Sequence, residues 1–410
     1  MNPNITANQQ RRFLEFFARL QPHLAHDSGL PRRIKEMLSR DRAIGSRDRR
    51  LYRELLYTAV RFLPWIQPLL DADPATAARV VAWLAPELKH TSAYRAALRD
   101  DWPAAPATLA EKAAVLGSLL TVHRFLPEAL LPAWFRAHCS DAFESPHIDA
   151  MNERANLWVR LQVDDRAHVL AEFAGKGWTP VIPGEPPDAV CLPPNAEVAT
   201  TDAYRRGFCE IQDLGSQLVL LQVPIALGQI WLDACAGAGG KTLQLARLVG
   251  DAGRVDATDI RPQMLTELNE RATRARLTNI RIGCTPEAFY DGVLVDAPCS
   301  GTGTWRRLPH MKWYTQPAML TEFAADQLAI LHENAAHVRP GGLLVYATCS
   351  LSHVENHDVV AAFLAQHAEF SAETPARDWG AVSDGLGHTL LPGTRNSDGF
   401  YVALLQRRSA

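Results

Sequence analysis

Two cysteines, Cys299 and Cys349, each follow an apolar run that is typical of a strand buried on both faces. The runs are Gly292–Val295 and Leu343–Tyr346, and small residues surround both cysteines. Because ligands of open parallel α/β sheets bind beyond the carboxyl ends of the strands, we expect both thiols at one sheet edge. A single buried cysteine is usually an inert apolar side chain, but this pair, one member of which follows Asp296 by three residues, favours thiol chemistry.

A glycine-rich turn lies upstream, between a predicted strand and a predicted helix. It consists of Cys235, Ala236, Gly237, Ala238, Gly239, Gly240 and Lys241. Glycines let the backbone approach a ligand, and a helix start offers free amides. Asp259 stands twenty residues past Gly239, at the position from which a carboxylate accepts hydrogen bonds from ribose hydroxyls. Together they favour an adenosine cofactor over a simple tight turn.

Two other classes of nucleotide-binding site also use a glycine-rich turn. A Walker phosphate loop requires glycine where this chain has Cys235, which excludes it. An NAD site stays open, although nothing downstream supplies a hydride-transfer site.

His353 and His357 lie four residues apart in HVENH, but that order is not HExxH, which argues against a zinc hydrolase. Glu355 and Asn356 are expected to start or support a helix there.

The elements that must position these motifs alternate from strand to helix over residues 226–410. That rhythm predicts an α/β fold with a doubly wound, mostly parallel sheet, and the strand-like 399–408 is expected to pair antiparallel at its end. Residues 1–145 show apolar positions at helical spacing, with prolines between them, and predict an all-helical bundle. Residues 146–225 mix strand and helix patterns and predict a small α+β bridging lobe.

Composition bounds the class of protein. With 410 residues, 47% apolar and 21% charged, the chain is expected to be globular and to form two or three domains. No apolar run has membrane-spanning length, and the N-terminus has no secretory core. Seven cysteines without paired CxxC spacing favour neither a disulfide framework nor a metal site. We expect a monomeric cytoplasmic protein without a metal or a membrane partner.

Charge is unevenly distributed along the chain. The formal net charge is −3, yet residues 32–61 carry an excess of six positive charges. Arg47, Arg49 and Arg50 lie at the centre of this stretch. Such a concentration suits phosphate binding, although a solvated helical face with ion pairs explains the charge equally well.

Three motifs carry a specific resemblance. CAGAGGKT, DAPCSGTG and YATCS, in this order, resemble the Nop/Sun family of RNA 5-methylcytosine methyltransferases, and within it the bacterial ribosomal RNA methyltransferase B type. The resemblance covers about 208–405, including the approach segment 212–217 and Asp398–Tyr401. It implies a Rossmann-like class I methyltransferase sheet, and the basic N-terminal bundle more loosely resembles a NusB-like RNA-binding domain.

The resemblance also implies roles for single residues. Cys349 would add to carbon 6 of cytosine, which makes carbon 5 nucleophilic, and Cys299 would aid release of the adduct. Asp296, supported by Lys241, would hydrogen-bond the base. S-adenosylmethionine would be held by the 235–241 loop, Asp259 and Asp296. Phosphates of RNA would meet Arg306, Arg307 and Lys312, with Trp305 or Trp313 either stacking on bases or simply packed.

The sequence departs from this family pattern in three places. Gly283–Thr285 stands where an acid usually faces the adenine, and Glu287 is a substitute. Ala238 replaces a commoner proline, and WVRLQ lacks an expected asparagine. Ribosomal RNA is the first expected substrate and transfer RNA the second. A DNA cytosine-5 methyltransferase, which would attack with Cys299, and a catalytically vestigial ribosome-assembly factor are the alternatives.

Overall fold

The computed structural model describes residues 3–99, 101–121 and 123–409, and it divides into two compact units. The first unit comprises the residues up to Arg154 together with Trp305–Gln316. The second comprises Ala155–Thr304 and Pro317–Ala410. The expectation of an uninterrupted catalytic domain over 226–410 is therefore wrong at 305–316, which packs with the helical bundle.

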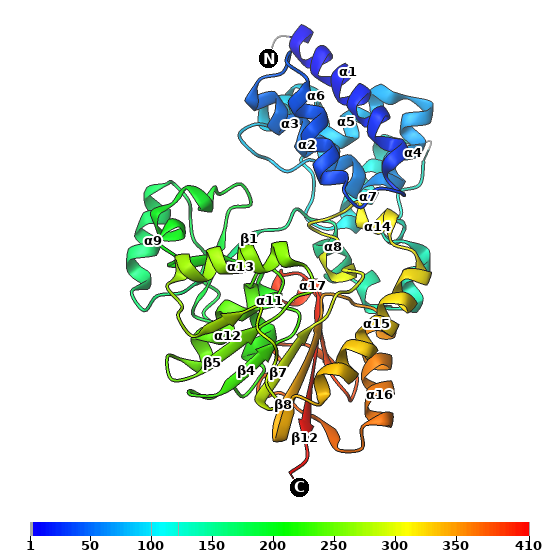
Figure 1. Cartoon of the computed structure of the whole chain (residues 1–410). Helices are drawn as coiled ribbons and strands as arrows, with labels where there is room; N and C mark the ends of the chain where they lie inside the picture. The colour runs from blue at the N-terminus through cyan, green and yellow to red at the C-terminus, as the bar shows by residue number, and fades with distance from the viewer. Residues whose placement is uncertain (1–2, 100, 122, 410) are drawn as a thin grey trace. The chain divides into compact units, whose positions relative to one another are not determined.

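The first unit is helical, as the apolar spacing predicts (Figure 1). Its α-helices are α1 (Pro3–Leu20), α2 (Leu30–Arg40), α3 (Ser46–Arg61), α4 (Leu63–Ala72), α5 (Pro74–Leu84), α6 (Ser92–Arg99), α7 (Leu109–Leu119), α8 (His147–Met151) and α14 (Met311–Tyr314). Short 3-10 helices cover Gln21–His23, Pro127–Leu130, Ala133–Ala137 and Asp141–Phe143. Asp73 caps α5 by accepting hydrogen bonds from the amides of Ala75 and Thr76, and Thr108 and Glu111 form a capping box on α7. The starts of α5 and α7 thus follow from local side-chain chemistry.

The bridging lobe belongs to the second unit but has its own sheet and core. Its elements are β1 (Leu157–Leu161), α9 (Arg166–Gly175), β2 (Ala189–Leu192), a 3-10 turn (Val198–Thr200), α10 (Asp202–Arg205) and β3 (Cys209–Ile211). The strands are antiparallel in the order β2-β1-β3. Val159, Val190 and Phe173 are buried in its centre. The lobe contains both helices and strands, as the mixed pattern of this stretch predicts.

The large sheet confirms the doubly wound α/β prediction. Its strands are β4 (Ile230–Asp233), β5 (Arg254–Ala257), β6 (Ile280–Ile282), β7 (Tyr290–Asp296), β8 (Val338–Thr348), β9 (Phe370–Glu373), β10 (Val382–Ser383), β11 (His388–Leu390) and β12 (Phe400–Arg407). The order is β10-β11-β12-β8-β7-β4-β5-β6, with β9 also paired to β12. Strands β4 to β8 are parallel, and β12 pairs antiparallel with β8 as expected. Within this sheet the chain runs from β4 through β5 to β6 on one side and then crosses to β7 and β8 on the other. The topological switch point therefore lies between β4 and β7.

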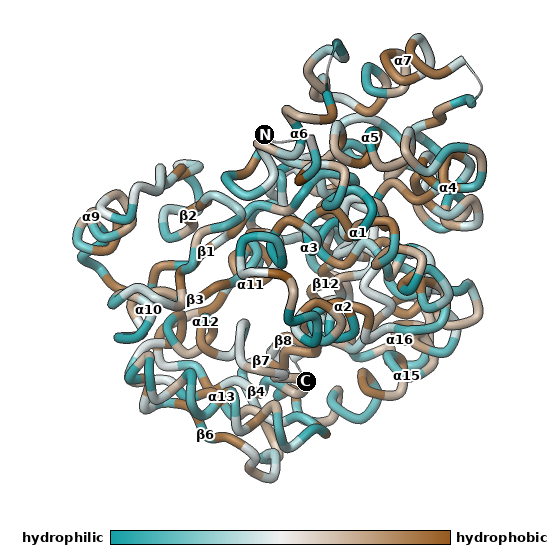
Figure 2. Tube along the Cα trace, turned by 90° about the horizontal axis from the view of Figure 1, so that it is seen from above, coloured by the Kyte–Doolittle hydropathy of each residue, from teal (hydrophilic) through white to brown (hydrophobic). Residues whose placement is uncertain are grey.

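Helices cover both faces of this sheet. They are α11 (Leu214–Leu221), α12 (Gly240–Val249), α13 (Pro262–Ala275), α15 (Pro317–Ala335), α16 (His357–Gln366) and α17 (Pro392–Arg395), with 3-10 turns at Thr302–Thr304 and His353–Glu355. In Figure 2, α12 and α13 lie on one side of the central strands and α15 and α16 on the other. Neighbouring residues of β7 face opposite ways: Val293 packs with α15 and α16, and Leu294 packs with α11 and α12. The strand is buried on both faces, as its unbroken apolar run predicts.

Candidate functional site

The structure brings together the two thiols that the sequence places at one sheet edge. Cys299 follows β7, Cys349 follows β8, and their Sγ atoms lie 3.3 Å apart. Both side chains are only partly buried. The hydrogen bond between the thiols, together with burial, raises the pKa of Cys299 well above its ordinary value. Cys299 therefore keeps its proton at neutral pH.

Backbone contacts join the two cysteine loops. The amide of Gly303 donates to the carbonyl of Cys349 at 2.9 Å, and the amide of Leu351 donates to the hydroxyl of Thr302 at 2.8 Å. A Cβ at Gly303 would lie 2.3 Å from the carbonyl oxygen of Gly399, so only glycine allows this approach. The glycine of the GTG sequence thus serves close packing of the loops.

Asp296 ends β7 and faces the first turn of α12. Its Oδ2 accepts a hydrogen bond from Lys241 Nζ at 2.8 Å, and the lysine side chain is 6% exposed. The same ammonium lies 4.9 Å from the centre of the Phe400 ring, a cation–π distance. Two neighbours of different chemistry, a carboxylate and an aromatic ring, therefore hold the charge of Lys241.

The glycine-rich turn joins β4 to α12 next to this pair. Gly239 has φ +89°, and a Cβ there would lie 2.1 Å from a methyl group of Leu268. Asp259, after β5, accepts a hydrogen bond from the amide of Gly237 at 2.8 Å and pairs with Arg261. That arginine lowers the pKa of Asp259, so the carboxylate is charged at neutral pH. The glycine at 239 therefore allows the turn to pack closely against α13, and a charged carboxylate lies beside the turn.

Two further side chains of this region were not singled out from the sequence. Asp233, at the end of β4, is buried, and burial raises its pKa to about 7 while the hydroxyl of Thr242 donates to it at 2.7 Å. Ile260, directly after Asp259, is 95% exposed. An apolar side chain next to an acid at the end of the second strand is the pattern that could have identified it.

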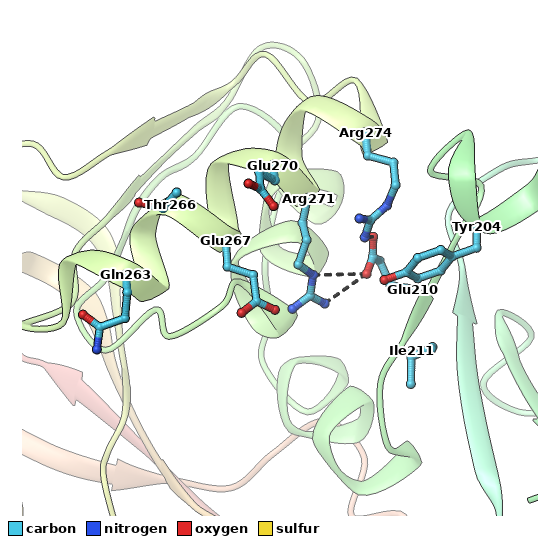
Figure 3. Close-up of a pocket in the computed structure, with 9 residues that line it drawn as sticks. All are labelled: Tyr204, Glu210, Ile211, Gln263, Thr266, Glu267, Glu270, Arg271 and Arg274. Atoms are coloured by element: carbon cyan, nitrogen blue, oxygen red, sulfur yellow. Dashed lines mark hydrogen bonds and ion pairs between the residues drawn. The ribbon is translucent and has the colours of Figure 1, made fainter. Parts of the chain in front are cut away.

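An arginine on α13 connects the glycine-rich turn to the bridging lobe, and Figure 3 shows its pairing with Glu210 of that lobe. Arg271 donates to the carbonyl oxygen of Ala238 at 2.7 Å and pairs with Glu210 of β3 at 3.0 Å. Arg274, one turn later, pairs with the other oxygen of Glu210. These residues line a polar cavity of about 570 Å³. The turn is therefore fixed from outside its own motif.

The predicted RNA contacts of the 305–316 segment are corrected by burial. Lys312 is 1% exposed, and its Nζ donates to the carbonyl oxygens of Arg61 at 2.9 Å and Leu130 at 3.0 Å and to Asn152 Oδ1 at 2.7 Å. Burial, reinforced by Arg61, lowers its pKa well below the ordinary value. Arg306 is also 1% exposed. Neither side chain is available to a phosphate, because both belong to the interior of the first unit.

The tryptophans of that segment pack within the first unit. Trp305 is fully buried with its ring 4.7 Å from that of Phe135, and Trp313 Nε1 donates to the carbonyl of Val60 at 2.8 Å. Of the two roles that the sequence left open, packing is the one observed. Arg307, by contrast, is exposed.

The basic stretch lies on α2, α3 and the turn between them. Arg47 and Arg50 are exposed on α3, whereas Arg49 is half-buried and donates to the carbonyl oxygen of Leu38 at 3.2 Å. Ion pairs such as Arg32–Glu36 occur within the stretch, but they leave its positive excess. A phosphate-binding face and a solvated helical face are both compatible with this placement.

Other candidate sites are occupied by internal pairs. Glu287 pairs with Arg254 at 2.8 Å and with Arg281 at 2.8 Å, which commits its carboxylate to the β5–β6 region. His353 and His357 contact separate acids, Asp358 and Asp384.

Within the described ranges, no cluster of three His, Cys, Asp or Glu side chains is arranged to hold a metal ion. None of the helices described is both long and apolar enough to cross a membrane.

Comparison with known proteins gives a consistent result. Residues 222–406 match the family of 16S rRNA methyltransferases RsmB/F. A ribosomal RNA small subunit methyltransferase B from Vibrio vulnificus is 32% identical over 293 residues, which are 68% of this chain and 67% of the relative. One from Sodalis glossinidius is 30% identical over 395 residues, 88% of this chain and 90% of the relative. The crystal structure of PH0851 shares the fold, with a TM-score of 0.68 at 20% identity, over 91% of this chain and 93% of that one.

Proposed function

Because the chain belongs to the RsmB/F family of methyltransferases, we propose that it methylates carbon 5 of cytosine in RNA, with S-adenosylmethionine as the cofactor. Ribosomal RNA, the substrate in the relatives' names, is the first candidate and transfer RNA the second. The observation that carries the proposal is the contact of Cys299 with Cys349 at 3.3 Å, beyond the carboxyl ends of β7 and β8 and one strand from the glycine-rich turn that follows β4. Thiols at that position suit covalent activation of a pyrimidine.

The proposed reaction assigns a different task to each side chain. The thiolate of Cys349 bonds to carbon 6 of cytosine, and carbon 5 becomes nucleophilic. Asp296, held by Lys241, receives hydrogen bonds from the polar edge of the base. After carbon 5 is methylated, its proton passes to a general base, the electrons of that C–H bond restore the ring double bond, and the Cys349–carbon 6 bond breaks to return the thiolate. Cys299, which lies against Cys349, aids this release.

The residues at the edge of β4 and β5 fit the cofactor. Residues 235–241 and Asp296 would hold its amino acid end, and Asp259 would accept hydrogen bonds from its ribose. Ile260, exposed beside Asp259, offers an apolar surface for the adenine. When bound, S-adenosylmethionine supplies the methyl group.

The basic face of α3 is proposed to bind the RNA backbone through Arg47, Arg49 and Arg50, with Arg307 as a further exposed contact. Replacing the three α3 arginines with glutamate should weaken RNA binding and lower its salt dependence, since each lost phosphate contact removes about 0.7–0.9 from the slope of log K against log salt. An unchanged slope would show that this face is only a solvated surface.

The decisive experiment is covalent trapping. Wild type, Cys299→Ala and Cys349→Ala are incubated with cytosine-containing ribosomal RNA and S-adenosylmethionine, denatured and resolved by size. An adduct that accumulates in Cys299→Ala and is lost in Cys349→Ala supports the proposal. The opposite pattern would make Cys299 the nucleophile, as in a DNA-type enzyme. Absence of adduct, methyl transfer and calorimetric cofactor binding would instead favour a ribosome-assembly factor.

A further inference from the structure

Glu355 is a buried carboxylate that touches both cysteine loops. It lies in the short turn before α16 and is fully shielded from solvent. Its Oε1 accepts a hydrogen bond from the amide of Ser300 at 2.8 Å, and its Oε2 accepts one from the hydroxyl of Ser350 at 2.6 Å. Ser300 follows Cys299 and Ser350 follows Cys349. One side chain therefore connects the neighbours of both thiols.

Two further hydrogen bonds complete the surroundings of this carboxylate. The hydroxyl of Ser300 also donates to Oε2, and Gln327 Nε2 donates to Oε1 at 3.1 Å and to the carbonyl oxygen of Pro298 at 2.9 Å. These donors are hydroxyl, amide and backbone groups. Burying a carboxylate is costly unless its oxygens are satisfied, and here both oxygens accept two hydrogen bonds. Such an arrangement holds the loops more rigidly than apolar contacts of the same size would.

We propose that Glu355 is a positioning residue for the methyl transfer, holding Cys299 against Cys349 through the two serines. The inference rests on the function proposed above, in which Cys349 must be the thiolate and Cys299 the partner that aids release. Glu355 contacts neither thiol and acts through the serines and through its negative charge. That charge adds to the thiol–thiol hydrogen bond and to burial in raising the pKa of Cys299.

Thiol alkylation tests this role without requiring methyl transfer. Free enzyme is treated with iodoacetamide at pH 8, and modification of each cysteine is followed by peptide mass spectrometry. In Glu355→Gln the side-chain shape is kept but the charge is gone, so Cys299 should be alkylated several-fold faster, because alkylation follows the thiolate fraction. Tyr346→Phe is the matched control, since the Tyr346 hydroxyl donates only to the backbone carbonyl of Glu355. Its Cys299 rate should equal that of wild type.

Enzyme kinetics supply the second readout. Glu355→Gln should lower kcat by roughly tenfold or more, about 1.4 kcal/mol, while KM for the cofactor stays within twofold. It should also shift the pH profile of kcat to lower pH. Equal Cys299 alkylation rates in Glu355→Gln and wild type, with an unshifted pH profile, would overturn the inference. If wild type transfers no methyl group, the proposed function fails, and the alkylation rates still decide whether Glu355 controls the thiol pair.

Discussion

Lys241 Nζ and Asp296 Oδ2 lie 2.8 Å apart, and this contact joins the start of α12 to the end of β7. The two elements carry different parts of the proposed chemistry, since one follows the cofactor turn and the other precedes Cys299. A shift of the start of α12 relative to the end of β7 would separate the two ions. On the proposed function, we expect the pair to fix the distance between the methyl donor and the base.

Because the two ions act together, their substitutions should not be additive. Asp296→Asn and Lys241→Met should each lower kcat/KM by roughly 100-fold, and the double variant should be little worse than either, which corresponds to a coupling of about 1–3 kcal/mol. A double-mutant cycle on methyl transfer measures this coupling. Additive losses would mean that the two side chains act separately.

Asp233 should make stability depend on pH. Burial raises its pKa from 3.8 to about 7, so the folded chain binds its proton more tightly than the unfolded chain does. Its contribution is fully present below pH 4 and is lost as pH rises through about 7. Urea unfolding at pH 5 and pH 8 should show a drop that Asp233→Asn removes and that Asp251→Asn, an exposed control, retains. Equal drops in both variants would contradict this assignment.

Lys312 should contribute to stability and not to RNA affinity. Lys312→Met leaves three oxygen acceptors without a donor, at about 1–3 kcal/mol each where no water enters, and should lower the unfolding temperature of the first unit. The salt slope of RNA binding, measured below that temperature, should stay that of wild type. A slope reduced by about one unit would restore Lys312 as a phosphate contact.

Arg271 should support cofactor binding from outside the pocket motif. Arg271→Ala removes the hydrogen bond to the carbonyl of Ala238 and should raise the Kd for S-adenosylmethionine roughly tenfold, about 1.4 kcal/mol. Arg274→Ala is the control, because it also loses a pairing with Glu210 while the bond of Arg271 to Ala238 is kept. Calorimetry should separate the two variants. Equal affinities of the two variants would show that the contact of Arg271 with the turn stabilises the fold without supporting cofactor binding.

The contact between the thiols should make them sensitive to oxidation. Hydrogen peroxide should oxidise Cys299 and Cys349 to a disulfide, taking two protons and two electrons from the thiols and yielding two molecules of water. Methyl transfer should fall with disulfide formation and return with a dithiol reductant. Cys284→Ser should oxidise like wild type. Recovery of both cysteines as free thiols after peroxide treatment would contradict the prediction.

Local sequence signals predicted much of the second unit. The apolar run at Val293–Val295 predicted a strand buried on both faces, and the positions of Cys299 and Cys349 after their strands predicted that the thiols meet. Parallel strands place their carboxyl ends at one edge, so strand order and loop positions were enough.

Contacts between distant segments were not predictable in this way. Nothing near Lys312 in the sequence indicates that it is buried among Arg61, Leu130 and Asn152. Arg271 belongs to an ordinary amphipathic helix pattern, and only the folded chain brings it to Ala238. Glu355 was expected to support a helix start, whereas its carboxylate turns inward to the serines. Charge in a sequence does not reveal whether a side chain ends in water or in the interior.

The packing of Trp305–Gln316 into the helical bundle also limits how this protein can be divided into fragments. A fragment that begins at residue 155 would carry an indole, a lysine and a second tryptophan without the rings and carbonyls that satisfy them in the full chain. This stretch begins six residues after Cys299, so misfolding there would reach the reactive loop. Inactivity of such a fragment would reflect a misfolded loop and not a lost RNA contact. Variants of this protein should therefore keep both units in one chain.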